Sequence, residues 1–188
     1  MEATQISFKT KNQLFNDFIS LVKSAFESFS IEGWEVRQLR QTFKINHLKP
    51  IVFISVISGH QLGQQYYSKT KTDNQITRQA HNKQEVTIRF SATRLEGLND
   101  DLSTYNSTDI LKVIRAYMQS PEGIQFLASL GYAQYKAQNI NEMNFTNDSD
   151  NFQFLPHFDC TFLYTDKWRS TIPEITKIRE KHHGIHHI

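Results

Sequence analysis

The sequence has little cysteine, glycine or proline: one Cys, seven Gly and four Pro in 188 residues. A single cysteine excludes an intramolecular disulfide, which suits a reducing compartment. The low Gly and Pro content argues against a fibrous repeat and against a long disordered segment. Hydrophobic residues make up 38% of the chain. A chain of this length can bury a core without cross-links, so we expect one domain.

Strong net charge and long apolar runs are also missing. The formal net charge is +2, which is too mild for nucleic-acid binding by a whole basic face but permits a local basic patch. The longest apolar run, residues 51–57, is broken by Ser55 and is far shorter than the ~18 residues of a membrane helix. The first residues lack a basic start followed by an apolar run, so we expect no signal peptide and no membrane partner.

Residues 12–29 have the spacing of an amphipathic helix. Apolar side chains recur there every three or four residues, and Thr10 with Gln13 matches a capping box. The pattern predicts a helix with a buried aromatic stripe. Its apolar positions are Leu14, Phe15, Phe18, Leu21, Val22, Ala25, Phe26 and Phe29.

Two shorter helices are predicted in the second half of the chain. Residues 108–119 carry an apolar face and follow Ser107, which we expect to be the N-cap. A third helix is expected after Ser120. It begins with Pro121, where the missing N–H group costs no hydrogen bond, and Gly131 is expected to end it.

Four segments have strand character. Residues 84–93, QEVTIRFSAT, alternate apolar and polar side chains, as in a half-buried strand. The apolar, β-branched run at 51–59 is typical of a buried central strand, and residues 34–43 are strand-like. Residues 152–166 alternate again, although Pro156 cannot donate a hydrogen bond, so we expect that strand to be edge-like or bulged there.

Residues 60–83 are polar and contain almost no aliphatic side chains. Structureless loops of this length are uncommon in compact domains. We therefore predict a β-hairpin arm that continues the strand at 51–57, turns at 72–74 and returns into 84–93. The fold class is predicted to be α+β: an antiparallel sheet with this arm, covered on one face by the N-terminal helix and the central helix pair.

The predicted domain covers residues 1–173, followed by a tail at 174–188. Residues 132–144 are expected to be extended and 146–150 to form a turn. Few apolar side chains follow residue 166, so we expect the chain from 167 onward to be loosely held.

Three groups of reactive side chains have simpler interpretations. The histidines at 182, 183, 186 and 187 have helical metal-ligand spacing, but Gly184 and the lack of an acidic or thiol partner favour adventitious affinity. Cys160 and His157 fall on opposite faces of a strand, which favours a buried thiol over a nucleophile. The acidic pairs at 100–101 and 148/150 lie in turn-like stretches. We expect no catalytic residue, metal or cofactor.

Seven side chains on or near the arm are our candidates for a subunit interface or a DNA passage: Tyr66, Tyr67, Lys69, Lys71, Arg78, Lys83 and Arg89. Three interpretations are open. The arm can be a solvated hairpin, or a docking arm whose edges pair with another chain by β-augmentation. It can also contact phosphates, since cations interleaved with tyrosines bind nucleic acid.

The order of elements resembles a known family over roughly residues 12–166. The stretches that carry the likeness are WEVRQLRQ, PIVFISVIS, QEVTIRFSATRLEG, SPEGIQFLASLGYA and FQFLPHFDCTFLY. They resemble the neck or tail terminator proteins of tailed bacteriophages, also called tail completion proteins.

The resemblance implies an α+β subunit without catalytic residues that assembles as a hexameric ring. Such a ring caps the tail tube and joins it to the head-side connector. The implied partners are copies of the chain, the tail tube protein, the connector or stopper protein and genomic DNA passing through the lumen, with the tail sheath as a further candidate. The implied location is the neck of the virion, after synthesis in the host cytoplasm. The alternative is a small nucleic-acid-binding module that uses the basic arm.

Overall fold

The computed structural model describes residues 5–39, 50–72, 75–94, 105–142, 144–146 and 152–173. The elements in these residues are β1 (Gln5–Ser7), α1 (Lys11–Ser28), β2 (Glu35–Gln38), β3 (Ile51–Thr72), β4 (Gln75–Thr93), α2 (Ser107–Gln119), α3 (Pro121–Ser129), β5 (Ala133–Ala137), β6 (Asn144–Thr146), β7 (Phe152–Phe154) and β8 (His157–Pro173).

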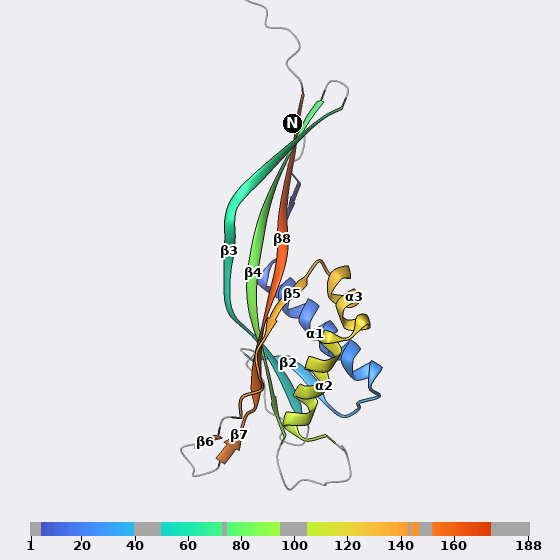
Figure 1. Cartoon of the computed structure of the whole chain (residues 1–188), viewed down its shortest axis with the longest axis vertical. Helices are drawn as coiled ribbons and strands as arrows, with labels where there is room; N and C mark the ends of the chain where they lie inside the picture. Colours follow the sequence, from blue (N-terminus) through green and yellow to red (C-terminus); the bar gives the residue numbers. More distant parts are fainter. Residues whose placement is uncertain are drawn as a thin grey trace, which may run out of the picture.

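One sheet of six strands organises the fold, in the order β1-β8-β4-β3-β2, with β5 also beside β8. All its pairs are antiparallel except β2 with β3. The three helices lie on one face of the lower sheet, while β3, β4 and β8 extend far beyond them as an arm (Figure 1). The α+β prediction is confirmed, with one parallel pair added. Strands β6 and β7 form a separate hairpin.

Helix α1 confirms the predicted amphipathic helix and its N-cap, but Phe29, predicted on the buried stripe, is the C-cap and is exposed. The Thr10 hydroxyl oxygen accepts a hydrogen bond from the backbone N–H of Gln13, and the Gln13 Oε1 accepts one from the backbone N–H of Thr10. The apolar stripe packs on the sheet, where the ring of Phe18 contacts those of Phe90 and Phe162. These three rings are almost completely buried. Burying such a side chain contributes roughly 1.5–3 kcal/mol.

The strand alternation predicted for residues 84–93 is confirmed. Val86, Ile88 and Phe90 are buried beneath the helices, while the residues between them lie on the opposite face. Strand β8 adds Phe158, Cys160 and Phe162 to the buried side, as its alternating pattern indicated. The core therefore lies between the helices and the lower halves of three long strands.

The predicted arm is confirmed, but it has three strands and not two. Strand β3 reaches Thr72 and β4 starts at Gln75; the tip residues 73 and 74 lie outside the described residues. Strand β8 pairs with β4 without a register shift from Ser91↔His157 to Gln75↔Pro173. The expectation of a loosely held chain from residue 167 is therefore wrong for 167–173. Backbone hydrogen bonds to β4 hold that segment, and they need no apolar side chain.

Two local predictions are corrected. The N-cap of α2 is Asn106, not Ser107: the Asn106 Oδ1 accepts from the Asp109 amide at 2.8 Å. The strand predicted at 152–166 divides at residues 155–156, so β7 and β8 are separate strands. Pro156 lies at the break because it lacks an amide hydrogen. The helix after Ser120 is confirmed, with Pro121 in its first turn and Gly131 at a φ of +81° just beyond its end.

Several sequence predictions fall outside the described residues. They are the acidic pairs at 100–101 and 148/150, residues 147–150 of the turn predicted at 146–150, and the tail at 174–188 with its four histidines.

Helices α2 and α3 meet backbone to backbone at Gly123. A Cβ atom there would overlap the carbonyl oxygen of Tyr117 and lie 2.7 Å from its carbonyl carbon. We predict that Gly123→Ala lowers the free energy of unfolding by about 1–3 kcal/mol, because backbone atoms must move. Gly59→Ala is the matched control, since its Cβ would meet its nearest atom at 3.6 Å. Urea unfolding measures both, and equal losses would contradict the explanation.

Candidate functional site

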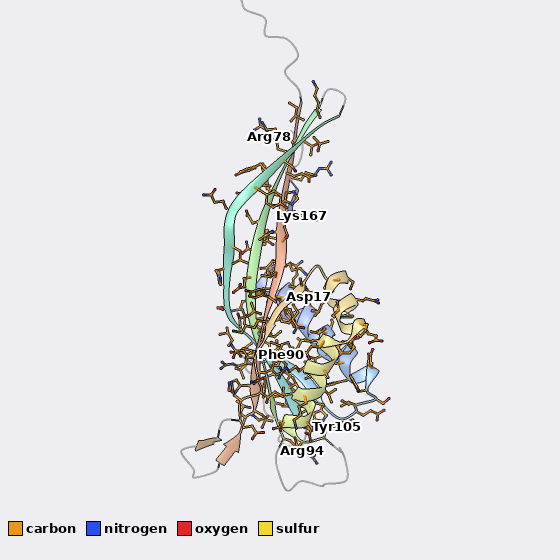
Figure 2. The ribbon with its side chains drawn as sticks, viewed as in Figure 1. Asp17, Arg78, Phe90, Arg94, Tyr105 and Lys167 are labelled. Carbon is orange, nitrogen blue, oxygen red and sulfur yellow. The ribbon has the colours of Figure 1, made fainter. Side chains whose placement is uncertain are left out.

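The arm, defined here as residues 60–72, 75–83 and 165–173, is strongly basic. Its described residues hold one carboxylate, Asp166, and six cations: Lys69, Lys71, Arg78, Lys83, Lys167 and Arg169. Figure 2 shows Arg78 on the upper part of the arm, far from the helices, and Lys167 on the lower part of the arm. Sequence reasoning missed Lys167 and Arg169 because it ended the last strand at residue 166. The aromatic and β-branched residues beyond that point, Trp168, Thr171 and Ile172, were the available signal.

Register divides the seven predicted residues between the two faces of the sheet. Side chains alternate along a strand, and directly paired residues share a face. Because β4 has no bulge against β8, Arg78 lies on the same face of the sheet as the buried Ile88. The face that the helices cover lower down therefore carries Tyr67, Lys69, Lys71 and Arg78. The opposite face carries Tyr66, Lys83 and Arg89. The structure does not bring the seven into one site.

Two tyrosines expose their rings on the outer strand of the arm. Tyr66 stacks on His81 across β3 and β4, with ring centres 4.7 Å apart and planes 7° from parallel. His81 pairs on its other side with Lys167 of β8. Tyr67 is 67% exposed, and its hydroxyl donates to the Gln65 Oε1 at 3.2 Å. Exposed aromatic area beside cations is suited to contact with another macromolecule.

Arg89 has a different environment from the arm cations. Its Nε lies 2.7 Å from the Asp159 Oδ1, and its Nη2 lies 2.9 Å from the Oδ2. This hydrogen-bonded ion pair raises the pKa of Arg89. On the same face, two residues along the strands, the hydroxyl oxygens of Thr87 and Thr161 are 3.1 Å apart. The polar face of residues 84–93 therefore joins β4 to β8 in the body of the protein.

A polar cluster lies where the arm leaves the body. The Asp17 Oδ2 accepts from the Lys9 Nζ at 2.6 Å and from the Tyr132 hydroxyl at 2.8 Å. The same ammonium group lies 4.1 Å from the centre of the Tyr132 ring, close enough for a cation–π contact. The Lys9 amide donates to the Asp166 Oδ1 of β8 at 3.2 Å. The cluster thus ties helix α1 and the segment after β1 to the inner strand β8 and to the residue before β5.

An open pocket of about 460 Å³ lies between α3 and β5. Met118, Leu127 and Tyr132 contribute to its walls, with Ile124 and Tyr135 at its exposed rim. Its lining is mainly apolar and contains no carboxylate, histidine or cysteine. The pocket is therefore suited to an apolar side chain and not to acid–base chemistry.

The described part of the chain contains no group of three or more His, Cys, Asp or Glu side chains that could hold a metal ion. Within the same residues, no helix combines the length and apolar character needed to cross a membrane. Cys160 is completely buried, and burial raises the pKa of its thiol to about 12. The prediction of a buried cysteine is confirmed.

Comparison with known proteins places the chain in a family. Residues 14–174 match the family model described as E217 gateway protein gp29. The chain belongs to this family of phage gateway proteins. A search of curated proteins found no match. Membership in the gateway protein family supports a structural virion role in head–tail joining. The more specific terminator assignment, drawn from the resemblance, stays a prediction.

Tyr132 of the polar cluster makes the free energy of unfolding depend on pH in the alkaline range. Burial, followed by the hydrogen bond to Asp17, raises the pKa of Tyr132 above the ordinary tyrosine value of ~10. The folded state thus keeps a proton that the unfolded state releases. This stabilisation is complete below about pH 10 and is lost as pH rises toward the folded-state pKa.

We predict that Tyr132→Phe lowers the free energy of unfolding by about 1–3 kcal/mol at neutral pH, through loss of the bond to a carboxylate. The variant should also lose less stability than the parent between neutral pH and about pH 11, one unit above the ordinary pKa. Urea unfolding across this range is the measurement. Tyr135→Phe, at an exposed position, should follow the parent, and a parallel pH dependence for Tyr132→Phe would contradict the assignment.

Proposed function

We propose that the chain is a structural subunit of a phage head–tail junction that forms a ring, hexameric as the resemblance implies. In this proposal the ring caps the tail tube and joins it to the head-side connector around the DNA passage. The observation that carries the proposal is the match to the gateway protein family over residues 14–174. The protein acts through shape and surface contacts, without catalysis or a cofactor.

The arm gives such a subunit a long reach beyond its own core. Three paired strands project past the helices (Figure 1). A third strand stiffens the arm, since isolated two-stranded hairpins are marginally stable. Its partners in this proposal are neighbouring copies, the tail tube protein and the connector or stopper protein, with the sheath as a further candidate. Genomic DNA passes through the lumen without sequence-specific contacts.

Electron microscopy of intact virions tests the proposal directly. With the chain labelled by a specific antibody, we expect label at the junction of head and tail, and a ring in the averaged density. A virion without the protein, or label only on the capsid or fibres, would contradict the proposed function.

Removing the tip of the arm should separate assembly from folding. We predict that deletion of residues 68–76 leaves a cooperatively folded domain, because the buried core lies below the arm. The same deletion should impair incorporation into virions. Thermal unfolding and the amount of protein in purified particles measure the two effects. Loss of cooperative unfolding would mean that the tip belongs to the folding core.

A second candidate function is nucleic-acid binding by the arm, favoured by its six cations against one carboxylate. Phosphate contacts release counterions, so affinity should fall steeply with salt. We predict that Lys69→Glu/Lys71→Glu weakens binding to double-stranded DNA and flattens the slope of log K against log salt. Lys11→Glu/Lys23→Glu makes the same charge change on α1 and should leave that slope unchanged. Absence of binding at low salt would eliminate this function.

A further inference from the structure

The exposed large hydrophobic side chains of the described residues collect along the two edges of the main sheet. Seven of the eight lie there, and Phe29 at the end of α1 is the exception. The edge formed by β2 and β3, here called the β3 edge, carries Leu39, Ile57, Tyr66 and Tyr67. The edge formed by β1, β5 and the adjoining α3, here called the β5 edge, carries Phe8, Ile124 and Tyr135.

The β3 edge is a long strand without a neighbour. Strand β2 pairs only with residues 51–54 of β3. From Ser55 to Thr72, no strand in the described residues pairs with the outer side of β3. This edge is about 60 Å long at ~3.3 Å per residue. A long unpaired edge is a template for pairing with another chain.

The β5 edge combines short open strands with a recess. Strands β5 and β1 both pair with β8, and neither has another strand on its outer side among the described residues. The pocket of about 460 Å³ opens beside β5, with Ile124 and Tyr135 at its rim. This edge can therefore receive both a strand and an apolar side chain.

The apolar residues of the two edges lie at matching heights along the strands. Two rows cross the sheet beside Ile57 and Tyr135: Val56–Ile88–Cys160–Ala137 and Gly59–Val86–Phe162–Gln134. Higher in the sheet, Tyr67 shares the row Tyr67–Ala80–Trp168–Ile6, and Phe8 follows two residues after Ile6. Ile57 is thus level with Tyr135, and the two arm tyrosines are level with the segment of Phe8.

We propose that the β3 edge of one copy docks on the β5 edge of the next copy. Ile57 then lies beside the pocket and Tyr135, while Tyr66 and Tyr67 lie beside Phe8. A rotation axis parallel to the strands preserves height, so both apolar groups meet at once. The chain directions also agree, since β3 runs opposite to β5 and β1 and the new contact is antiparallel.

This contact joins two different surfaces, as a head-to-tail ring requires. A two-fold contact would instead place one edge against the same edge of the partner. The inference rests on the proposed ring, because a closed ring uses both edges of every subunit.

Cross-linking between introduced cysteines tests the contact in the full chain. The double variant Ile57→Cys/Tyr135→Cys is height-matched, and both native side chains are exposed. Tyr67→Cys/Tyr135→Cys is the mismatched control, because Ile57 lies beside Ile88 and Tyr67 pairs with Ala80, which puts them ~25 Å apart along the strands. The native Cys160 is buried and stays outside the reaction. Each variant is treated with a short bis-maleimide at millimolar protein concentration and analysed by denaturing electrophoresis.

We expect a ladder of covalent oligomers from the matched double variant, at least tenfold more than from the mismatched one, and none from either single variant. Dimers from a single variant would indicate a two-fold contact and overturn the inference. A ladder from the mismatched pair alone, or no cross-link from any variant, would overturn it as well. Virion microscopy separates this contact from the proposed function. A ring seen in virions without matched cross-links would refute the contact only. Matched cross-links with no protein in virions would refute the proposed function only.

Discussion

The continuous ladder between β4 and β8 is the constraint on which the rest of the structure depends. It runs without a register shift from Ser91↔His157 in the body to Gln75↔Pro173 in the arm. Each of these strands therefore belongs to the core at one end and to the arm at the other. Because β3 pairs with the other side of β4 along most of the same length, the central strand has neighbours on both sides. The packing of Phe90 and Phe158 in the body thus fixes the direction in which the arm projects.

Polar and aromatic contacts of helix α1 hold the segments that pack beside β8. Asp17 on α1 binds both Lys9 and Tyr132, and the Tyr132 ring packs against Phe18 and Phe162. A buried phenol needs a hydrogen-bond partner, and Asp17 supplies it. Since Lys9 follows β1 and Tyr132 precedes β5, one carboxylate orients both segments that cover the β8 edge. The edge proposed to meet a neighbour is therefore positioned by a half-buried carboxylate on α1.

The sequence was sufficient for the elements that depend on local chemistry. The capping box at Thr10, the proline and glycine that bound α3 and the alternation in residues 84–93 all predicted real features. Long-range pairing was harder to predict. The last part of β8 is held by backbone bonds to β4, so its side chains gave little apolar signal. Lys167 and Arg169 were missed for this reason, and the parallel pairing of the four-residue β2 has no local signature. The seven predicted residues fall on two faces because side chains alternate along a strand: Tyr66 and Tyr67 are consecutive, and Arg78 differs in parity from Lys83 and Arg89 on the regular strand β4.

Charge and apolar area are distributed differently on the arm, and this separates the two kinds of contact proposed for it. The exposed apolar side chains of the arm lie on the outer strand β3, whereas four of the six cations, Arg78 and Lys167 among them, lie on the inner strands β4 and β8; Lys69 and Lys71 lie on β3. A neighbour that pairs with an edge leaves the faces of those inner strands open to solvent. Arms held side by side would bring like charges within a Debye length of ~8 Å at physiological salt, which opposes association. An anionic surface in the lumen or on an adjoining protein would offset that repulsion. Ring closure by the edges and binding of an anionic partner by the faces would then favour each other.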